Sequence, residues 1–315
     1  MRDLIRIPLL AMASTIVIAA QAPPNSLPGW AYHVPDKVQP KVEEAKGTVH
    51  LPGSTKEYEA GKTEDAAHPP DWFPEEHPAA PTVVTGAPGR TEPACGSCHL
   101  MSGQGHPESA DLAGLPVEYF IQQMAYFKSG ARKDPARMNA IAMAIPDADV
   151  RKAAEYFSAL KPRVWVKVVE TENVPKTYIS NRGRVRLPLP DGGNEPLGNR
   201  IIALAQDPFR TANRDPHSPF FAYVPRDSIE KGEQLVKNGA GRTIQCAICH
   251  GDSLRGLGDV PRIAGLQPVY IARQLYDFKS GASAGISSGL MKKVVANLTD
   301  DDIIAISAYT GTLEP

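Results

Sequence analysis

Two stretches of the chain carry apolar residues at helical spacing, and both end in the letters FKSGA. Apolar side chains three or four positions apart fall on one face of an α-helix. The members of these faces are Phe120, Met124 and Phe127 in the first stretch and Ile271, Leu275 and Phe278 in the second. Gly130 and Gly281 follow at positions where a helix would end. The pattern therefore predicts two equivalent amphipathic helices.

Further helices are predicted near the C-terminus of each half. Residues 299–313 begin with Thr299, a favourable N-cap residue, and three aspartates occupy the first turn, where negative charge is stabilising. The matching segment of the first half is 146–160.

A further helix is predicted at the start of the second half. It covers residues 227–239, in which Asp227 and Glu230 are spaced as a capping box.

The rest of the chain shows no sustained helical period. Residues 23–93 are rich in proline and glycine, and residues 163–226 contain two strand-like segments, 165–170 and 183–189, together with turn signals. The 30 prolines among 315 residues also require long non-helical segments. We therefore expect a loop-rich N-terminal extension and an inter-domain insertion with some β structure.

The two helical stretches belong to a longer internal repeat. Cys95–Ala131 aligns with Cys246–Ala282 at an offset of 151 residues without a gap, and 15 of these 37 positions are identical. After a two-residue insertion the offset becomes 153, which places Met138 opposite Met291. An internal duplication of this length predicts two domains of the same fold.

Each repeat opens with Cys-x-x-Cys-His, and these motifs contain every cysteine of the chain: Cys95, Cys98 and His99, then Cys246, Cys249 and His250. The pattern is typical of covalent c-type haem attachment, in which two thiols bind the vinyl groups and the histidine binds the iron. A redox dithiol would need a βαβ setting, and a zinc site would need a fourth ligand. Two disulfides would leave the histidines without a purpose. The sequence thus predicts two covalently bound c-type haems.

One methionine follows each motif at a matching position, Met138 in the first repeat and Met291 in the second. A thioether ligand favours reduced iron and raises the potential, as suits an electron carrier. We predict these methionines as the distal iron ligands, the alternative being that they only fill the core. Met101 is too close to His99 to reach the opposite haem face. The remaining rivals in the first repeat are Met124, Met143 and His106.

The sequence resembles the dihaem class I cytochromes c of the cytochrome c4 type. The resemblance is carried by CAICHG, PRIAGL, YIARQLYDFKSGA and LMKKVVANLTDDDIIAISAYTGTL and by their first-half counterparts, and it covers about half of the chain. It implies a mostly α fold with two tandem cytochrome c domains, His/Met ligation and electron transfer in the periplasm. The expected divisions are a signal peptide (1–22), an N-terminal extension (23–93), a first cytochrome c domain (94–162), an inter-domain insertion (163–226) and a second cytochrome c domain (227–315).

Three features depart from the pattern of that family. Pro261 matches the proline whose carbonyl fixes the iron-binding histidine, but the first repeat has Ala110 there, so the acceptor for His99 is not identified. The residues before the first motif are too rich in proline and glycine for the usual opening helix. The second repeat does have this opening helix, and Gly232 on it would let Tyr309 approach closely because glycine has no side chain. The inter-domain insertion is also longer than the linker of the family.

The N-terminus has the composition of a secretory signal. Arg2 and Arg6 accompany an apolar run, 7–20, which is too short to span a bilayer, and Ala20-Gln21-Ala22 offers a cleavage site. Because the next residue is proline, an uncleaved anchor at residues 1–22 is the alternative. A net charge of −1 does not suggest a nucleic-acid-binding surface. We expect an exported, periplasmic protein.

The leading functional interpretation is a carrier that transfers single electrons between proteins of a respiratory or dehydrogenase chain, without catalytic residues of its own. A dihaem peroxidase is the alternative, but it needs an open iron site, whereas both repeats offer a methionine. A third functional interpretation is a dedicated cytochrome subunit of a periplasmic dehydrogenase or respiratory complex. The expected partners are an oxidase, a dehydrogenase or a respiratory complex. Basic residues that could meet them, although solvation alone is the simpler interpretation, are Lys128, Arg132, Lys133, Lys279, Lys292 and Lys293.

Overall fold

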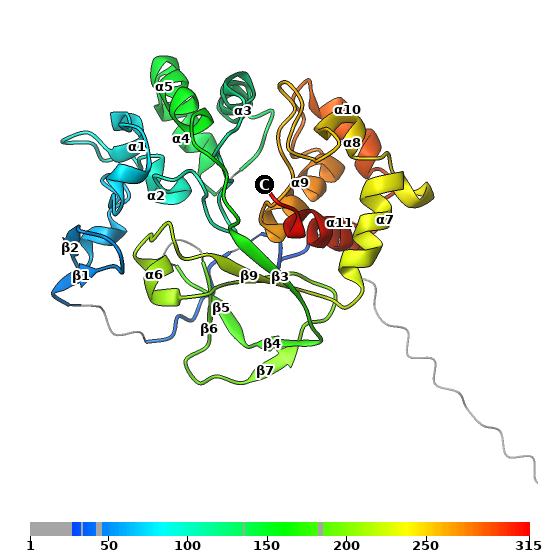
Figure 1. Cartoon of the computed structure of the whole chain (residues 1–315), viewed down its shortest axis with the longest axis horizontal. Coiled ribbons are helices and arrows are strands. Elements are labelled where there is room, and N and C mark those ends of the chain that lie inside the picture. Colours follow the sequence, from blue (N-terminus) through cyan, green and yellow to red (C-terminus); the bar gives the residue numbers. More distant parts are fainter. Residues whose placement is uncertain (1–26, 33, 42–45, 135, 182–184) are drawn as a thin grey trace, which may run out of the picture.

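The computed structural model describes residues 27–32, 34–41, 46–134, 136–181 and 185–315. Two groups of helices lie side by side, with the strands of the inter-domain insertion below them (Figure 1). We call the group of α1 to α5 the first lobe and the group of α7 to α11 the second lobe. The predicted signal peptide or anchor at residues 1–22 lies outside the described residues. In the described ranges, no helix has the length and apolar character needed to cross a membrane.

The helices of the two lobes follow the repeat. The first lobe contains α1 (Thr82–Thr85), α2 (Gly96–His99), α3 (Val117–Ser129), α4 (Met138–Ala144) and α5 (Asp147–Ser158). The second contains α7 (Ser228–Asn238), α8 (Ala247–His250), α9 (Pro268–Ser280), α10 (Ser288–Val295) and α11 (Asp300–Thr312). The remaining helical elements are α6 (Pro208–Ala212) and the 3₁₀ turns η1 (Lys62–Glu64), η2 (Pro74–Glu76) and η3 (Gly239–Gly241).

Most of the predicted helix ends are confirmed. Gly130 and Gly281 end α3 and α9 in left-handed conformations, and Thr299 begins α11 with a complete capping box to Asp302. The predicted capping box at Asp227 is wrong. That residue has φ +62°, a left-handed conformation instead of the extended one of an N-cap residue, and its side chain caps nothing. The N–H of Ile229 in the first turn donates to the carboxylate of Glu170 in the insertion.

The inter-domain insertion supplies most of the strands. Its three-stranded sheet has the order β3 (Val166–Glu170), β9 (Phe220–Val224) and β8 (Ile202–Ala205), with β3 parallel and β8 antiparallel to β9. Small antiparallel pairs are β4 (Asn173–Pro175) with β7 (Asn194–Pro196), β5 (Thr177–Ile179) with β6 (Arg186–Pro188), and β1 (Thr48–His50) with β2 (Glu57–Glu59). The strand predicted at 165–170 is confirmed as β3, and β6 lies within the second predicted segment.

The insertion contacts both lobes through β3 and the residue before it. Trp165 is buried, and its indole N–H donates to the carbonyl of Gly105 in the first lobe at 3.1 Å. In the second lobe, the amide of Gln267 donates to the carbonyl of Trp165 at 3.4 Å, and Val168 lies against Gly311 of α11. The insertion is therefore part of one packed structure with the lobes and not a free linker.

The lobes meet each other through equivalent surfaces. Asp111 and Arg262, which the repeat alignment places opposite each other, form an ion pair of 2.8 Å in which both side chains are almost completely buried. Arg132 and Ser283, which directly follow the aligned segment in the two repeats, pair as an antiparallel β-bridge. Contacts between equivalent residues arise when two like bodies meet around a two-fold axis. The two repeats therefore have an approximately two-fold arrangement.

The lobes differ in how their cores are closed. In the second, α7 crosses α11 at Gly232, where a β-carbon would lie 2.0 Å from the carbonyl oxygen of Ala305 and 2.8 Å from Tyr309, so the close approach predicted for this glycine is confirmed. In the first, the short α1 and the segment before it cover the corresponding side. His77 of that segment packs edge-on against Tyr156, the equivalent of Tyr309.

Candidate haem sites

The first Cys-x-x-Cys-His motif lines a cavity of about 480 Å³. Cys95, Cys98 and His99 reach it from α2 and its N-cap, and Met138 reaches it from the first residue of α4. The apolar part of the wall includes Leu112, Leu115, Phe120, Phe127, Ile141, Ile145 and Val150. The fold thus brings the predicted haem-binding residues of the first repeat to one largely apolar cavity, which suits a buried macrocycle.

Main-chain carbonyls orient both predicted iron-binding histidines. The Nδ1–H of His99 donates to the carbonyl of Ala110 at 2.8 Å, and that of His250 donates to the carbonyl of Pro261 at 2.8 Å. This tautomer leaves Nε2 with a lone pair for iron. Burial lowers the pKa of both histidines, which favours the neutral ring. The acceptor that the sequence did not identify is Ala110 itself, because alanine supplies a carbonyl as well as proline does.

The methionines of the first repeat occupy different places. Met124 and Met138 both line the cavity, but the equivalent of Met124 is a leucine buried in the core of the second lobe. Met143 is 62% exposed. Met101 packs in the core beside Gly96 and does not line the cavity. Only Met138 therefore combines a place at the cavity with a methionine at the matching position of the other repeat.

His106, the rival imidazole, lines the same cavity but is held within its own loop. Its Nδ1 accepts from the backbone N–H of Glu108 at 3.2 Å, and its Nε2 lies 3.2 Å from the hydroxyl of Ser109. Burial lowers its pKa to about 3, so the ring is neutral at ordinary pH. These contacts favour a structural role for His106.

The residues of the second motif pack against the core of the second lobe. His250 is buried, and Cys246 and Met291 pack against one core cluster among α7, α9 and α11. The hydroxyl of Thr243 donates to the carbonyl of Val294 at 2.7 Å, which joins the segment before the motif to α10, the helix that carries Met291. The predicted ligands of the second repeat thus lie on elements that share one core.

The two motifs differ in what covers them. In the first, Arg214 of the insertion donates through Nε to the carbonyl of Ser97 at 2.9 Å, and Ser97 is 6% exposed. The equivalent residue of the second motif, Ile248, is 63% exposed, and the neighbouring Cys249 is exposed as well. The insertion therefore covers one motif and leaves the other open.

The two motifs also differ in the charged side chains near them. Arg137 places Nη1 3.5 Å from the sulfur of Cys98, and Arg214 adds a second guanidinium at the carbonyl of Ser97. The repeat alignment puts Leu290 opposite Arg137, and it puts Ile248 opposite Ser97, the residue that Arg214 contacts. The first motif thus has two nearby cations where the second has apolar residues.

Arg132 has a role that the sequence did not reveal. Its guanidinium donates to the side-chain carbonyls of Gln123 at 2.8 Å and Gln274 at 2.6 Å, and it lies over the ring of Phe127. It therefore joins the lobes and is not a simply solvated charge. The available signal was that Arg132 follows FKSGA in the first repeat, whereas Ser283 follows it in the second.

Comparisons with known proteins identify the family. No protein-family model matches the chain. A thiosulfate dehydrogenase electron acceptor of Thiomonas intermedia (strain K12) is 28% identical over 234 residues, which are 73% of this chain and 83% of that protein. A cytochrome c4 of Stutzerimonas stutzeri is 33% identical over 221 residues, which are 68% of this chain and 82% of that protein. This chain belongs to the cytochrome c4 family.

Membership of the cytochrome c4 family confirms the predicted fold and cofactors. The protein is a mostly α cytochrome with tandem cytochrome c-like units, carries two covalently bound c-type haems and transfers single electrons between redox proteins. A solved thiosulfate dehydrogenase of Marichromatium purpuratum has a similar fold, with a TM-score of 0.50 and 24% identity over 74% of this chain and 39% of that one. The haems supply the redox chemistry, and the chain orients, buries and insulates them.

Proposed function

We propose that each repeat holds one haem through its own motif and methionine. The thioether bonds form at Cys95, Cys98, Cys246 and Cys249, and the axial pairs are His99 with Met138 and His250 with Met291. The observation that carries this assignment is the convergence of one motif and its matching methionine on the first cavity. The corresponding haem-binding units are residues 94–162 and 227–315, the extension and insertion being additions to them.

Intact mass measurement tests the attachment sites. We expect two covalent haems in the wild type and one in the double variant Cys95→Ala/Cys98→Ala. The matched double variant Cys246→Ala/Cys249→Ala should lose the other haem. Retention of two covalent haems in either variant would show that the haem is attached elsewhere.

We further propose that this cytochrome c4 is a periplasmic carrier that accepts electrons from a dehydrogenase and has no enzymatic activity of its own. The supporting relatives include two proteins named thiosulfate dehydrogenase electron acceptor. A methionine at each iron argues against the open site that a peroxidase needs. The reduced protein should therefore react with hydrogen peroxide no faster than a simple electron-transfer cytochrome, and rapid catalytic turnover of peroxide would contradict this.

Electrons enter or leave this carrier, in our proposal, at the second haem. Ile248 and Leu290 are exposed beside a haem-binding cysteine and the proposed methionine ligand, and Lys292 and Lys293 are exposed on α10. Exposed apolar side chains accompanied by exposed lysines fit a partner protein that presents apolar side chains and carboxylates. At the first haem, the insertion occupies the corresponding position.

Oxidation of the reduced cytochrome by membranes that contain the respiratory oxidase tests this surface. We expect the double variant Ile248→Glu/Leu290→Glu to be oxidised at least tenfold more slowly, because carboxylates would desolvate poorly and repel an acidic partner. Val164→Glu is the matched control, since Val164 is an exposed apolar residue of the insertion. Equal rates for the double variant and the control would place the docking surface elsewhere.

A further inference from the structure

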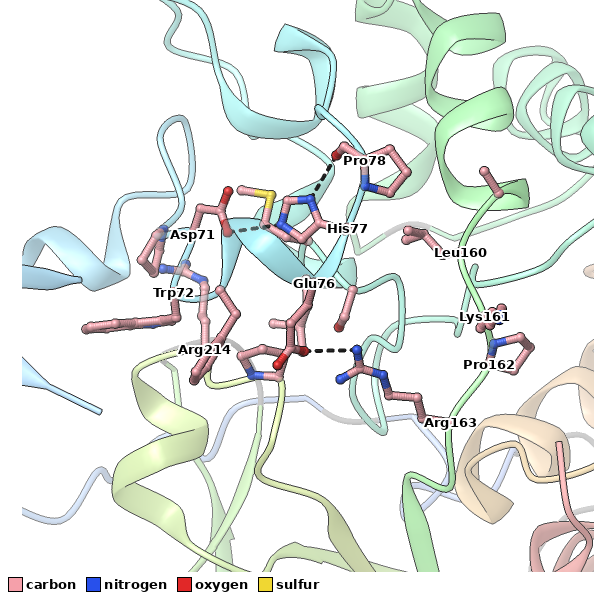
Figure 2. A pocket seen from close by; sticks show the side chains of 17 residues that line it. Asp71, Trp72, Glu76, His77, Pro78, Leu160, Lys161, Pro162, Arg163 and Arg214 are labelled. Carbon is pink, nitrogen blue, oxygen red and sulfur yellow. Dashed lines mark hydrogen bonds and ion pairs between the residues drawn. The ribbon is translucent and has the colours of Figure 1, made fainter. Parts of the chain in front are cut away.

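A second cavity, of about 550 Å³, shares no lining residue with the first haem cavity (Figure 2). Its walls come from residues 70–78 of the extension, 100–102 after α2 and 159–163 after α5, and Arg214 and Pro216 of the insertion close it. It therefore lies where the two non-repeated segments of the chain meet the first lobe. Electron transfer does not account for such a cavity.

Two buried donors of this cavity have no partner in the fold. The Nε of Arg214 donates to the carbonyl of Ser97, and its Nη2 donates to the carbonyl of Glu64 at 3.2 Å, but Nη1 is buried without a hydrogen bond. The hydroxyl of Ser102 is also buried without a partner. Burying unpaired donors is unfavourable, and a ligand that accepts hydrogen bonds would remove the cost.

The acidic groups of the wall are already engaged. Figure 2 shows Arg163 reaching Glu76 and His77 turned toward Asp71, with distances of 2.9 Å and 3.1 Å. The same Glu76 carboxylate also accepts from His217 at 3.0 Å. The lining contains three cationic side chains, Lys161, Arg163 and Arg214, against two carboxylates, so its formal charge is positive with His77 neutral. This balance favours an anion.

The remaining wall is apolar and bulky, with contributions from Trp72, Phe73, Leu100, Leu160 and Pro162. The volume falls within the range of small-molecule sites and exceeds what an inorganic ion needs. We propose that this cavity binds a small organic anion, with a carboxylate or phosphate group on Arg214 and Ser102 and an apolar body against this wall. The site is a ligand site beyond electron transfer, and it is independent of which residues bind the irons.

Calorimetric titration of the haem-loaded full chain tests the proposal, with benzoate and phenyl phosphate as probes for the two head groups and benzyl alcohol as the neutral counterpart. We expect saturable one-to-one binding of at least one anion and at least tenfold weaker binding of the alcohol. Arg214→Gln should weaken anion binding at least tenfold, and Ser102→Ala should weaken it to a smaller extent. Arg226→Gln is the matched control, because this arginine forms an exposed ion pair with Glu172 away from the cavity.

Lys161→Gln provides a second test should Arg214→Gln not fold, since Lys161 is an exposed lining residue whose charge can be removed without opening the structure. It should weaken anion binding severalfold. The proposal is overturned if neither anion binds, if benzyl alcohol binds as tightly as the anions, or if the folded cavity variants bind as tightly as the control.

Discussion

The two lobes of this cytochrome c4 use different segments of the chain to cover the core beside the haem motif. In the second, α7 closes the core, and the carbonyl of Val236 near its end accepts from the N–H of Cys246 at 3.1 Å. In the first, the carbonyl of Val83 in the four-residue α1 accepts from the N–H of Cys95 at 3.0 Å. The hydrogen bond to the N–H of the first cysteine is thus present in both lobes, although the long helix that provides it in the second lobe is replaced by a four-residue helix in the first.

The difference also separates the two haem environments. The first motif is covered by the extension and the insertion and has two arginines close to it, whereas the second motif has an exposed apolar border. The repeat therefore carries the proposed ligands of each site, and the segments outside the repeat set the charge and solvent access around the motifs. Access and charge are properties that an electron carrier needs to control separately at entry and exit.

The largest effect is expected at the ion pair where the equivalent surfaces meet. Asp111→Leu leaves the guanidinium of Arg262 buried without its carboxylate, which should cost about 3–5 kcal/mol of unfolding free energy. The double variant Asp111→Leu/Arg262→Leu should recover much of that loss. Urea denaturation of all three proteins measures it, and an equal loss in the single and double variants would show that shape, not charge, matters at this contact.

The next largest effect on stability is expected where α7 crosses α11 in the second lobe, a crossing that the first lobe lacks. Gly232→Ala places a methyl group against the main chain of Ala305 and should lower the unfolding free energy by about 1–3 kcal/mol. Gly289→Ala is the matched control, because Gly289 lies in α10 with open space around it and should tolerate the change. Equal stabilities by thermal unfolding would mean that α7 moves freely to admit the methyl group.

A smaller effect is expected on the redox potential. Arg137→Leu and Arg214→Gln each remove a positive charge near the first haem, which favours ferric iron. We expect the first potential to fall by an amount on the order of 1 kcal/mol, or tens of millivolts for one electron, while the second stays unchanged. Redox titration of each variant checks this. A shift confined to the second haem would reverse the assignment of the two environments.

The smallest effect is expected at Pro261. Pro261→Ala keeps the main-chain carbonyl that accepts from His250 and reproduces the arrangement already present at Ala110. The spectrum and potential of the second haem should therefore remain close to those of the wild type. A large loss of the second haem would show that the proline ring itself holds the loop and that the two repeats use different supports.

Most features that depend on recognisable sequence patterns were predicted correctly. The repeat, the haem motifs and the cap at Thr299 were predictable because each appears as a short motif or as identity between the two halves. The matching positions of Met138 and Met291 follow from the repeat, and their role as iron ligands stays a prediction. The prediction failed at Asp227 because the chain enters α7 there in a left-handed conformation, and a distant carboxylate of the insertion accepts from the first turn of the helix. The roles of Arg132 and of the Asp111 ion pair were hidden for a similar reason, since both depend on how the repeats pack.

The fold of the extension was the least predictable part. Its only helix in the first lobe, α1, has four residues and no helical period to detect among the described residues before the motif. What places it is tertiary contact, through Val83 and Val84 buried in the core of the first lobe. Short, proline-rich segments of this kind take their structure from the surface that they cover.

One measurement tests the central assignment most directly, namely redox titration with optical detection of methionine-ligated ferric haem. The wild type should show two such haems, and Met138→Ala and Met291→Ala should each remove one of them and leave the other intact. Met143→Ala, at an exposed methionine of α4, should leave both. If Met138→Ala left both signals in place, the first haem would have a different distal ligand and the assignment of one matched methionine to each repeat would be wrong.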